Sequence, residues 1–168
     1  VGSEMCIRDS CITHNASKTV GGSPNSKHRY GMAADWRMVD RSINPVALGI
    51  IAAQYFKAVG IYWYDGCAIV HTDTRDAKAT WLCDAPKHYP STTYQKFILP
   101  TIRRGCTGDA NRTATKMLQR LLGLTPDGIF GEGTENALLK AQEAHGLTVD
   151  GICGPASWKA ISGASKYL

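Results

Sequence analysis

Two stretches in the first half of the chain show different hydrophobic periods. In the first, apolar residues recur at helical spacing and predict an amphipathic helix that ends at Gly60. Asn44 and Pro45 precede this stripe and suit a helix cap and a first helical residue. The stripe comprises Leu48, Ile51, Tyr55 and Val59.

The second stretch, IYWYDGCAIVHTDT, alternates between apolar and polar residues around Asp65 and Gly66. Alternation of this kind predicts strands, and Asp-Gly is a strong signal for a tight turn between them. We therefore expect a β-hairpin.

The second half of the chain contains a short internal repeat. DGIFGEGT begins at Asp127, and the similar segment DGICGPAS begins at Asp150, 23 residues later. Each segment predicts a turn that leads into a helix. Two helical apolar faces accompany them, and three short helices packed together are the simplest arrangement. The first face comprises Met117, Leu118, Leu121 and Leu122, and the second comprises Ala137, Leu138, Ala141 and Ala144.

Between the two halves, CDAPKHYPSTTYQKFILPTIRR contains three prolines and no sustained apolar period, so it is interpreted as a linker. The expected fold class is α+β, with a small antiparallel sheet and packed helices followed by a small three-helix domain.

The composition is that of a globular chain of 168 residues, with 43% hydrophobic and 20% charged residues and a net charge of +5. A positive charge favours anionic partners such as nucleic acid or the bacterial wall. The basic residues are scattered and form no stripe interleaved with aromatic residues, which argues against nucleic acid. No apolar run is long enough to predict a membrane span.

The first ten residues, VGSEMCIRDS, resemble the translated end of a transposon adapter used in sequencing libraries. On this interpretation they are not native, the native segment starts near Cys11 and is truncated, and a signal peptide would not be visible. The other cysteines contain no CxxC pair. Cys67 with Cys83 and Cys106 with Cys153 are candidate disulfides, and buried thiols are the alternative.

Candidate metal chemistry lies in SKHRYGMAAD, where His28 and Asp35 stand seven residues apart. Histidine and carboxylate, with a third protein ligand and a water, make an open catalytic zinc site. His71 on the second predicted strand is the proposed third ligand, and strand alternation places Asp73 on the same face. Taken singly, each residue also has an ordinary structural explanation, as a loop, turn or strand residue.

From Asn15 to Trp81 the chain resembles the zinc D-alanyl-D-alanine carboxypeptidase family, which shares its fold with the hedgehog signalling domain. The resemblance rests on VGGSPNSKH, on the S-x-H-x-x-G-x-A-x-D core, on GIYWY and on VHTDTRDAKATW. It implies a single Zn²⁺ held by His28, Asp35 and His71.

The resemblance leaves the general base open. Some family members carry an acid three residues before the last zinc histidine, where this chain has Ala68. Members ending in His-x-Asp indicate Asp73, for which a role in orienting a ligand is the alternative. The hedgehog-like pattern indicates Asp65, for which a turn residue is the stronger alternative.

Substrate binding is assigned to Arg75 and Ser26. A stem peptide that ends in D-Ala presents a carboxylate that an arginine can hold with two hydrogen bonds. An exposed salt bridge is an equally ordinary use of Arg75. Family members carry a further arginine upstream of the zinc motif, which this chain does not show.

The second half resembles the three-helix peptidoglycan-binding module found in many wall hydrolases, through the two DGI-x-G turns, Gln119, Gln142 and Trp158. The expected organisation is an adapter scar over 1–10, a zinc peptidase domain over 11–83, a linker over 84–104 and the binding module over 105–163.

These features predict a monomeric zinc peptidase that hydrolyses peptidoglycan stem peptides, outside the cell or at the wall. A D-Ala-D-Ala carboxypeptidase is preferred. The alternatives are a phage endolysin that cuts within the stem peptide and a wall-binding protein without catalysis.

Overall fold

The computed structural model describes residues 5–8, 27–38, 43–86 and 98–168, and within these ranges the fold is mixed α+β. The strands form one sheet in the order β1-β2-β4-β3-β5. They are β1 (Met5–Arg8), β2 (Ala33–Met38), β3 (Ala58–Tyr64), β4 (Cys67–Asp73) and β5 (Ala79–Cys83). The helical elements are η1 (Lys27–Tyr30), α2 (Pro45–Ala52), α3 (Asp109–Leu121), α4 (Glu132–Ala144), α5 (Pro155–Ser162) and η2 (Ala164–Lys166).

The predicted hairpin is confirmed: β3 and β4 pair antiparallel from Ala58 opposite Asp73 to Tyr64 opposite Cys67, with Asp65 and Gly66 as the turn. The sheet is not wholly antiparallel as expected, because β5 pairs parallel to β3. At the other edge, β1 lies within the first ten residues, which were interpreted as an adapter scar, and it pairs with β2.

Helix α2 begins as predicted but ends earlier. The Asn44 side chain accepts a hydrogen bond from the Ala47 amide at 2.9 Å, and Pro45 is the first helical residue. The helix stops at Ala52, so Tyr55 is exposed and Val59 belongs to β3. The predicted stripe was therefore wrong, because the β-branched and aromatic run AVGIYWY forms a strand instead.

The two faces of the sheet differ in character because strand side chains alternate. One face packs into the hydrophobic core with α2. Buried residues from three strands and α2 meet there: Val59, Ile61, Val70, Leu82, Val46 and Ile50. The opposite face is left to polar and aromatic side chains, and the candidate site lies on it.

Two buried glutamines form hydrogen bonds to the two Asp-Gly turns of the internal repeat. Gln119 donates to Asp127 Oδ1 at 2.6 Å and accepts from the Gly128 amide at 2.9 Å. Gln142 makes the corresponding bonds, to Asp150 Oδ1 at 2.9 Å and from the Gly151 amide at 3.0 Å. The buried face of α4 is Thr134, Leu138 and Gln142, so the predicted alanine face was wrong except for Leu138.

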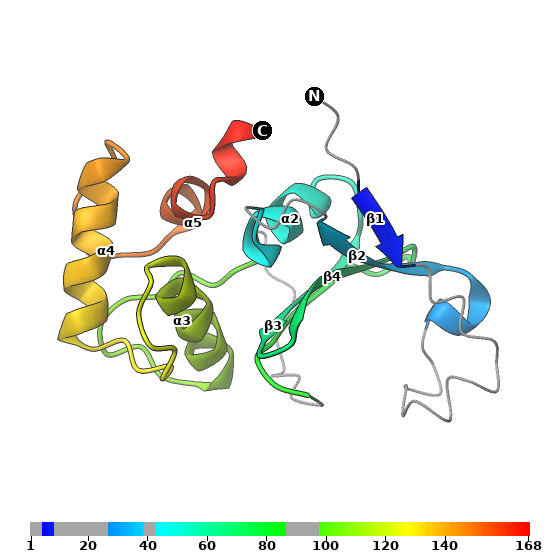
Figure 1. Ribbon diagram of the computed structural model, residues 1–168, viewed down its shortest axis with the longest axis horizontal. Coiled ribbons are helices and arrows are strands. Elements are labelled where there is room, and N and C mark those ends of the chain that lie inside the picture. Colours follow the sequence, from blue (N-terminus) through cyan, green and yellow to red (C-terminus); the bar gives the residue numbers. More distant parts are fainter. Residues whose placement is uncertain (1–4, 9–26, 39–42, 87–97) are drawn as a thin grey trace.

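The predicted linker ends in buried structure. Ile98, Leu99 and Ile102 belong to the same hydrophobic core as α2, α3 and α5. Ile102 forms an isolated bridge with Cys153, and the Trp158 indole donates to the Pro100 carbonyl at 2.9 Å. Helix α2 contacts the sheet on one side and α5 and η2 on the other (Figure 1).

Cys67, Cys83, Cys106 and Cys153 are not joined by disulfide bonds, so the candidate pairings are not formed. Burial raises the pKa of the Cys153 thiol well above its usual range. Among the residues that the structure describes, no helix is both long and apolar enough to cross a bilayer.

Candidate metal centre

His28 reaches the sheet from the short helix η1, which turns directly into β2. The Gly31 amide donates to the His28 carbonyl at 3.2 Å, and the Met32 amide donates to the Lys27 carbonyl at 3.1 Å. Gly31 has a φ of 65°, a left-handed conformation that glycine adopts without a steric penalty. The turn thus folds the histidine back over the strand that follows.

Asp35 and His71 lie directly opposite each other on the paired strands β2 and β4. Directly opposite residues point to the same face of a sheet with short Cβ separations. The register of this pair therefore brings together two side chains that are 36 residues apart in sequence.

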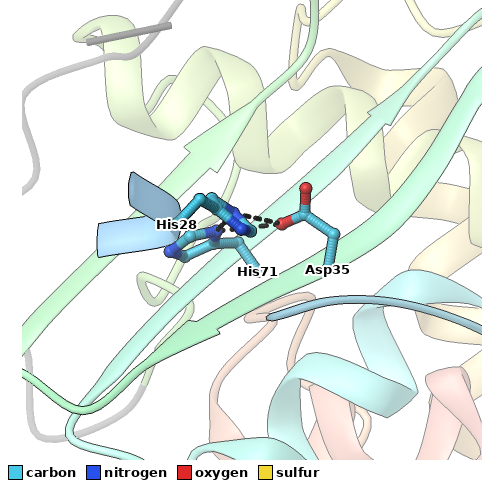
Figure 2. A group of neighbouring side chains, drawn as sticks. All are labelled: His28, Asp35 and His71. Carbon is cyan, nitrogen blue, oxygen red and sulfur yellow. Dashed lines mark hydrogen bonds and ion pairs between the residues drawn. The ribbon is translucent and has the colours of Figure 1, made fainter. Parts of the chain in front are cut away.

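Three donor atoms converge where His28, Asp35 and His71 meet (Figure 2). His28 Nε2 lies 3.0 Å from His71 Nδ1 and 3.2 Å from Asp35 Oδ1. His71 Nδ1 lies 2.9 Å from the same carboxylate oxygen. The three atoms form a nearly equilateral triangle.

The donor set and spacing of this triangle fit a small divalent cation. Ligand atoms about 2.0–2.1 Å from a tetrahedral zinc ion lie about 3.3 Å from one another, close to the observed edges. The side chains keep 14%, 28% and 10% of their surface exposed for His28, Asp35 and His71, so the triangle is partly buried. Three protein ligands leave a coordination position open, as catalytic zinc sites require.

The charge state of Asp35 also suits a metal ligand. Burial raises the pKa of this carboxyl, but the hydrogen bonds and charges of His28 and His71 outweigh burial and hold the pKa well below its ordinary value. The carboxylate is therefore ionised at neutral pH, the form in which it binds a cation.

Asp73 stands on the other side of the His71 ring. Its Oδ2 lies 3.2 Å from His71 Nε2, the nitrogen that faces away from the triangle. Arg75 donates from Nε to Asp73 Oδ1 at 2.7 Å, and its Nη2 donates to Oδ2. The predicted shared face of His71 and Asp73 is confirmed, and Arg75 joins it from just beyond the strand.

Trp81, Tyr62 and Gly60 form a wall beside His71 that sequence reasoning missed. Gly60 is paired with both His71 and Trp81 in the sheet, so these residues form one row across it. A Cβ on Gly60 would lie 2.3 Å from the indole, so the absent side chain leaves room for the ring. The indole donates to the Tyr62 hydroxyl at 2.8 Å, and its ring lies 5.3 Å from that of His71.

The remaining predicted site residues are not at the triangle. Asp65 lies in the hairpin turn, is fully exposed and approaches Arg120 Nη2 at 3.8 Å. His71 lies opposite Gly60, further along the hairpin. Most of the length of β4 therefore separates Asp65 from the donor triangle. Ser26 lies outside the described residues.

Comparison with known proteins identifies the second half of the chain. A family model described as a putative peptidoglycan binding domain matches residues 107–161. The chain carries a peptidoglycan-binding module. The predicted presence of such a module is thus supported, and α3, α4 and α5 lie within or close to the matched range. Comparison with curated proteins and with solved structures gave no match.

Proposed function

We propose that this protein is a zinc-dependent peptidase that hydrolyses the stem peptides of peptidoglycan. The observation that carries the proposal is the convergence of one carboxylate oxygen and two imidazole nitrogens within 3.2 Å, on the face of the sheet opposite the core. The same chain carries a peptidoglycan-binding module, which indicates association with the cell wall and makes the wall polymer the natural substrate.

In this proposal His28, Asp35 and His71 hold one Zn²⁺. When bound there, the ion would lower the pKa of a water ligand and polarise the scissile carbonyl. Hydrolysis adds water across the peptide C–N bond, giving a carboxylate and an amine. The sheet supplies two of the ligands from one strand pair, and η1 supplies the third.

The finer parts of the proposal follow the resemblance of Asn15 to Trp81 to the zinc D-alanyl-D-alanine carboxypeptidases. We infer that the sheet and its helix have the hedgehog/DD-peptidase fold and that α3 to α5 form the three-helix module. Removal of the terminal D-Ala is the preferred reaction. Attachment to the wall by the module would raise the local concentration of stem peptides.

The test combines metal analysis with mass spectrometry of muropeptides incubated with the protein. We expect one zinc per chain and a product shorter by one D-Ala. Both should vanish in His71→Ala and persist in His145→Ala, which alters an exposed histidine at the end of α4. Cleavage that survives His71→Ala would refute the proposal. Cleavage inside the stem peptide would instead identify an endopeptidase of the endolysin kind.

A second candidate is a wall-binding protein whose metal site has no catalytic role. The placement of the two predicted bases favours this alternative. Asp65 lies in the distant turn, Asp73 is fully buried against Arg75, and Ala68 stands where some family members have an acid. Wall binding and zinc binding without turnover by the whole chain would decide for it.

A further inference from the structure

Asp73 is the most completely buried carboxylate of the candidate site, with none of its side-chain surface exposed. A buried carboxylate is costly unless hydrogen bonds and an opposite charge compensate for its lost hydration. Arg75 provides both, through Nε, through Nη2 and through its backbone amide, which donates to Oδ1 at 3.1 Å. Both oxygens of Asp73 are therefore occupied.

His71 is a further polar neighbour of Asp73, and its two ring nitrogens face different groups. Nδ1 belongs to the donor triangle, while Nε2 faces Asp73 Oδ2 at 3.2 Å. Both nitrogens face a carboxylate, which can only accept a hydrogen bond. If Nδ1 binds a metal ion, the one proton of the neutral ring lies on Nε2 and is donated to Asp73 Oδ2.

We propose that Asp73 is a positioning residue, held by Arg75, that fixes the tautomer and ring orientation of His71 rather than accepting the proton of an attacking water. The inference rests on the proposed metal site and goes beyond it. The His71 ring lies between Asp73 and the triangle, and no oxygen of Asp73 is left to approach a substrate.

This assignment also changes the role of Arg75. The edge of the guanidinium formed by Nε and Nη2 holds Asp73, so it is not available to hold a substrate carboxylate. The guanidinium carbon also lies 5.4 Å from the centre of the Trp81 ring. Trp81, fixed by the Tyr62 hydroxyl, thus supports the arginine that supports Asp73. Arg75 is a structural partner of the metal centre.

The test measures metal affinity rather than activity. The whole chain is titrated with Zn²⁺ against a chromophoric chelator, for the wild type and for Asp73→Asn, with Asp76→Asn as the matched control. Asp76 is an exposed acid three residues further along the chain. Loss of a carboxylate partner to a metal-bound histidine lowers affinity by roughly ten- to a hundredfold. We expect that loss in Asp73→Asn and an unchanged affinity in Asp76→Asn.

A second variant and a spectrum distinguish a specific loss of zinc affinity from a loss of folding. Arg75→Lys retains the charge but cannot hold both oxygens of Asp73, and we expect a weaker affinity with the far-ultraviolet circular dichroism unchanged. Long-range ¹⁵N–¹H spectra of the zinc-loaded wild type should show His71 protonated at Nε2. Equal zinc affinity in wild type and Asp73→Asn would overturn the inference while leaving the metal site intact. His71 protonated at Nδ1 in the zinc-loaded protein would overturn both the inference and the assignment of Nδ1 as a ligand. A wild type that binds no zinc would overturn both.

Discussion

Gly60 is a residue whose missing side chain shapes the candidate site. The Trp81 indole fills the position where a Cβ would stand, 2.3 Å from its nearest ring atoms. We expect Gly60→Ala to displace the indole, to destabilise the protein by about 1–3 kcal/mol and to weaken zinc binding through Trp81 and Arg75. Urea unfolding and zinc titration measure the two effects.

The control for this substitution is Gly133→Ala, because Gly133 lies within α4 with open space around its Cβ position. Replacing a helical glycine with alanine should stabilise the protein by about 0.5–1 kcal/mol. Equal stability changes in both variants would show that the indole does not depend on Gly60.

The ionisation of Asp73 predicts how stability changes in acid. Burial raises the pKa of this carboxyl, but the hydrogen bonds and charge of Arg75 outweigh it, so the folded protein has a lowered pKa. The unfolded chain then binds a proton more readily than the folded protein does. The contribution of Asp73 to the free energy of unfolding is therefore present above about pH 4 and is lost as the pH falls through the folded pKa.

Urea unfolding of the metal-free protein at pH 6 and pH 3 tests this dependence. We expect a smaller loss of stability on acidification in Asp73→Asn than in wild type or Asp76→Asn. The same loss in all three proteins would contradict the assigned interaction.

The three residues of the donor triangle could be selected from the sequence, but their supporting contacts could not. His28, Asp35 and His71 are chemically distinctive types at an informative spacing. Asp73 was correctly placed on the face of His71, because strand alternation is local. The occupation of both its oxygens by Arg75 depends on side-chain conformations that no pattern encodes. Gly60 and Trp81 become neighbours only through the parallel pairing of β3 with β5.

Among the secondary-structure elements, α3 and α4 are each joined to the turn that follows them by a buried glutamine. Gln119 Nε2 donates to Asp127 Oδ1 and also to the Ile129 carbonyl at 3.2 Å. Gln119→Glu would replace this donor with an acceptor that faces a carboxylate. We expect a loss of about 1–3 kcal/mol in the free energy of unfolding, since buried groups of the turn are left without partners.

Gln142→Glu should have a similar effect, because Gln142 makes the equivalent contacts 23 residues further along the chain. Gln54→Glu is the matched control at an exposed position. A loss in the control as large as in the two buried positions would show that the turns do not depend on these glutamines.

Elements with strong local signals were predicted, and elements decided by tertiary packing were not. The cap at Asn44 and the Asp65-Gly66 turn are local signals, and both features were found. The end of helix α2 was not predicted, because its sequence is apolar on nearly every side. Such a helix has no amphipathic stripe that marks where it stops. β1 and β5 join the sheet through pairings between distant segments, and local periodicity does not encode these.

At the scale of the whole molecule, the end of the predicted linker joins the two halves. Ile98 is almost fully buried and lies beside Gly49 of α2. Four residues later, Ile102 exchanges two backbone hydrogen bonds with Cys153, at 3.2 and 2.8 Å. The sheet that carries the donor triangle and the peptidoglycan-binding module therefore share a core.

We expect Ile98→Ala to weaken both halves together, at a cost of about 2–5 kcal/mol. Hydrogen exchange followed by mass spectrometry should show faster exchange in the β3–β4 hairpin and in α5 alike. Faster exchange confined to one half would mean that the halves unfold independently, as a flexible linker would allow.

We propose that one zinc ion binds at the triangle of His28, Asp35 and His71. Equilibrium dialysis against Zn²⁺, followed by elemental analysis, tests it most directly in the wild type, in His28→Ala, Asp35→Ala and His71→Ala, and in His145→Ala as control. We expect one zinc per chain in the wild type and the control, and a lost or strongly weakened site in the other three. Unchanged zinc content in those three variants, or a wild type that binds none, would contradict it.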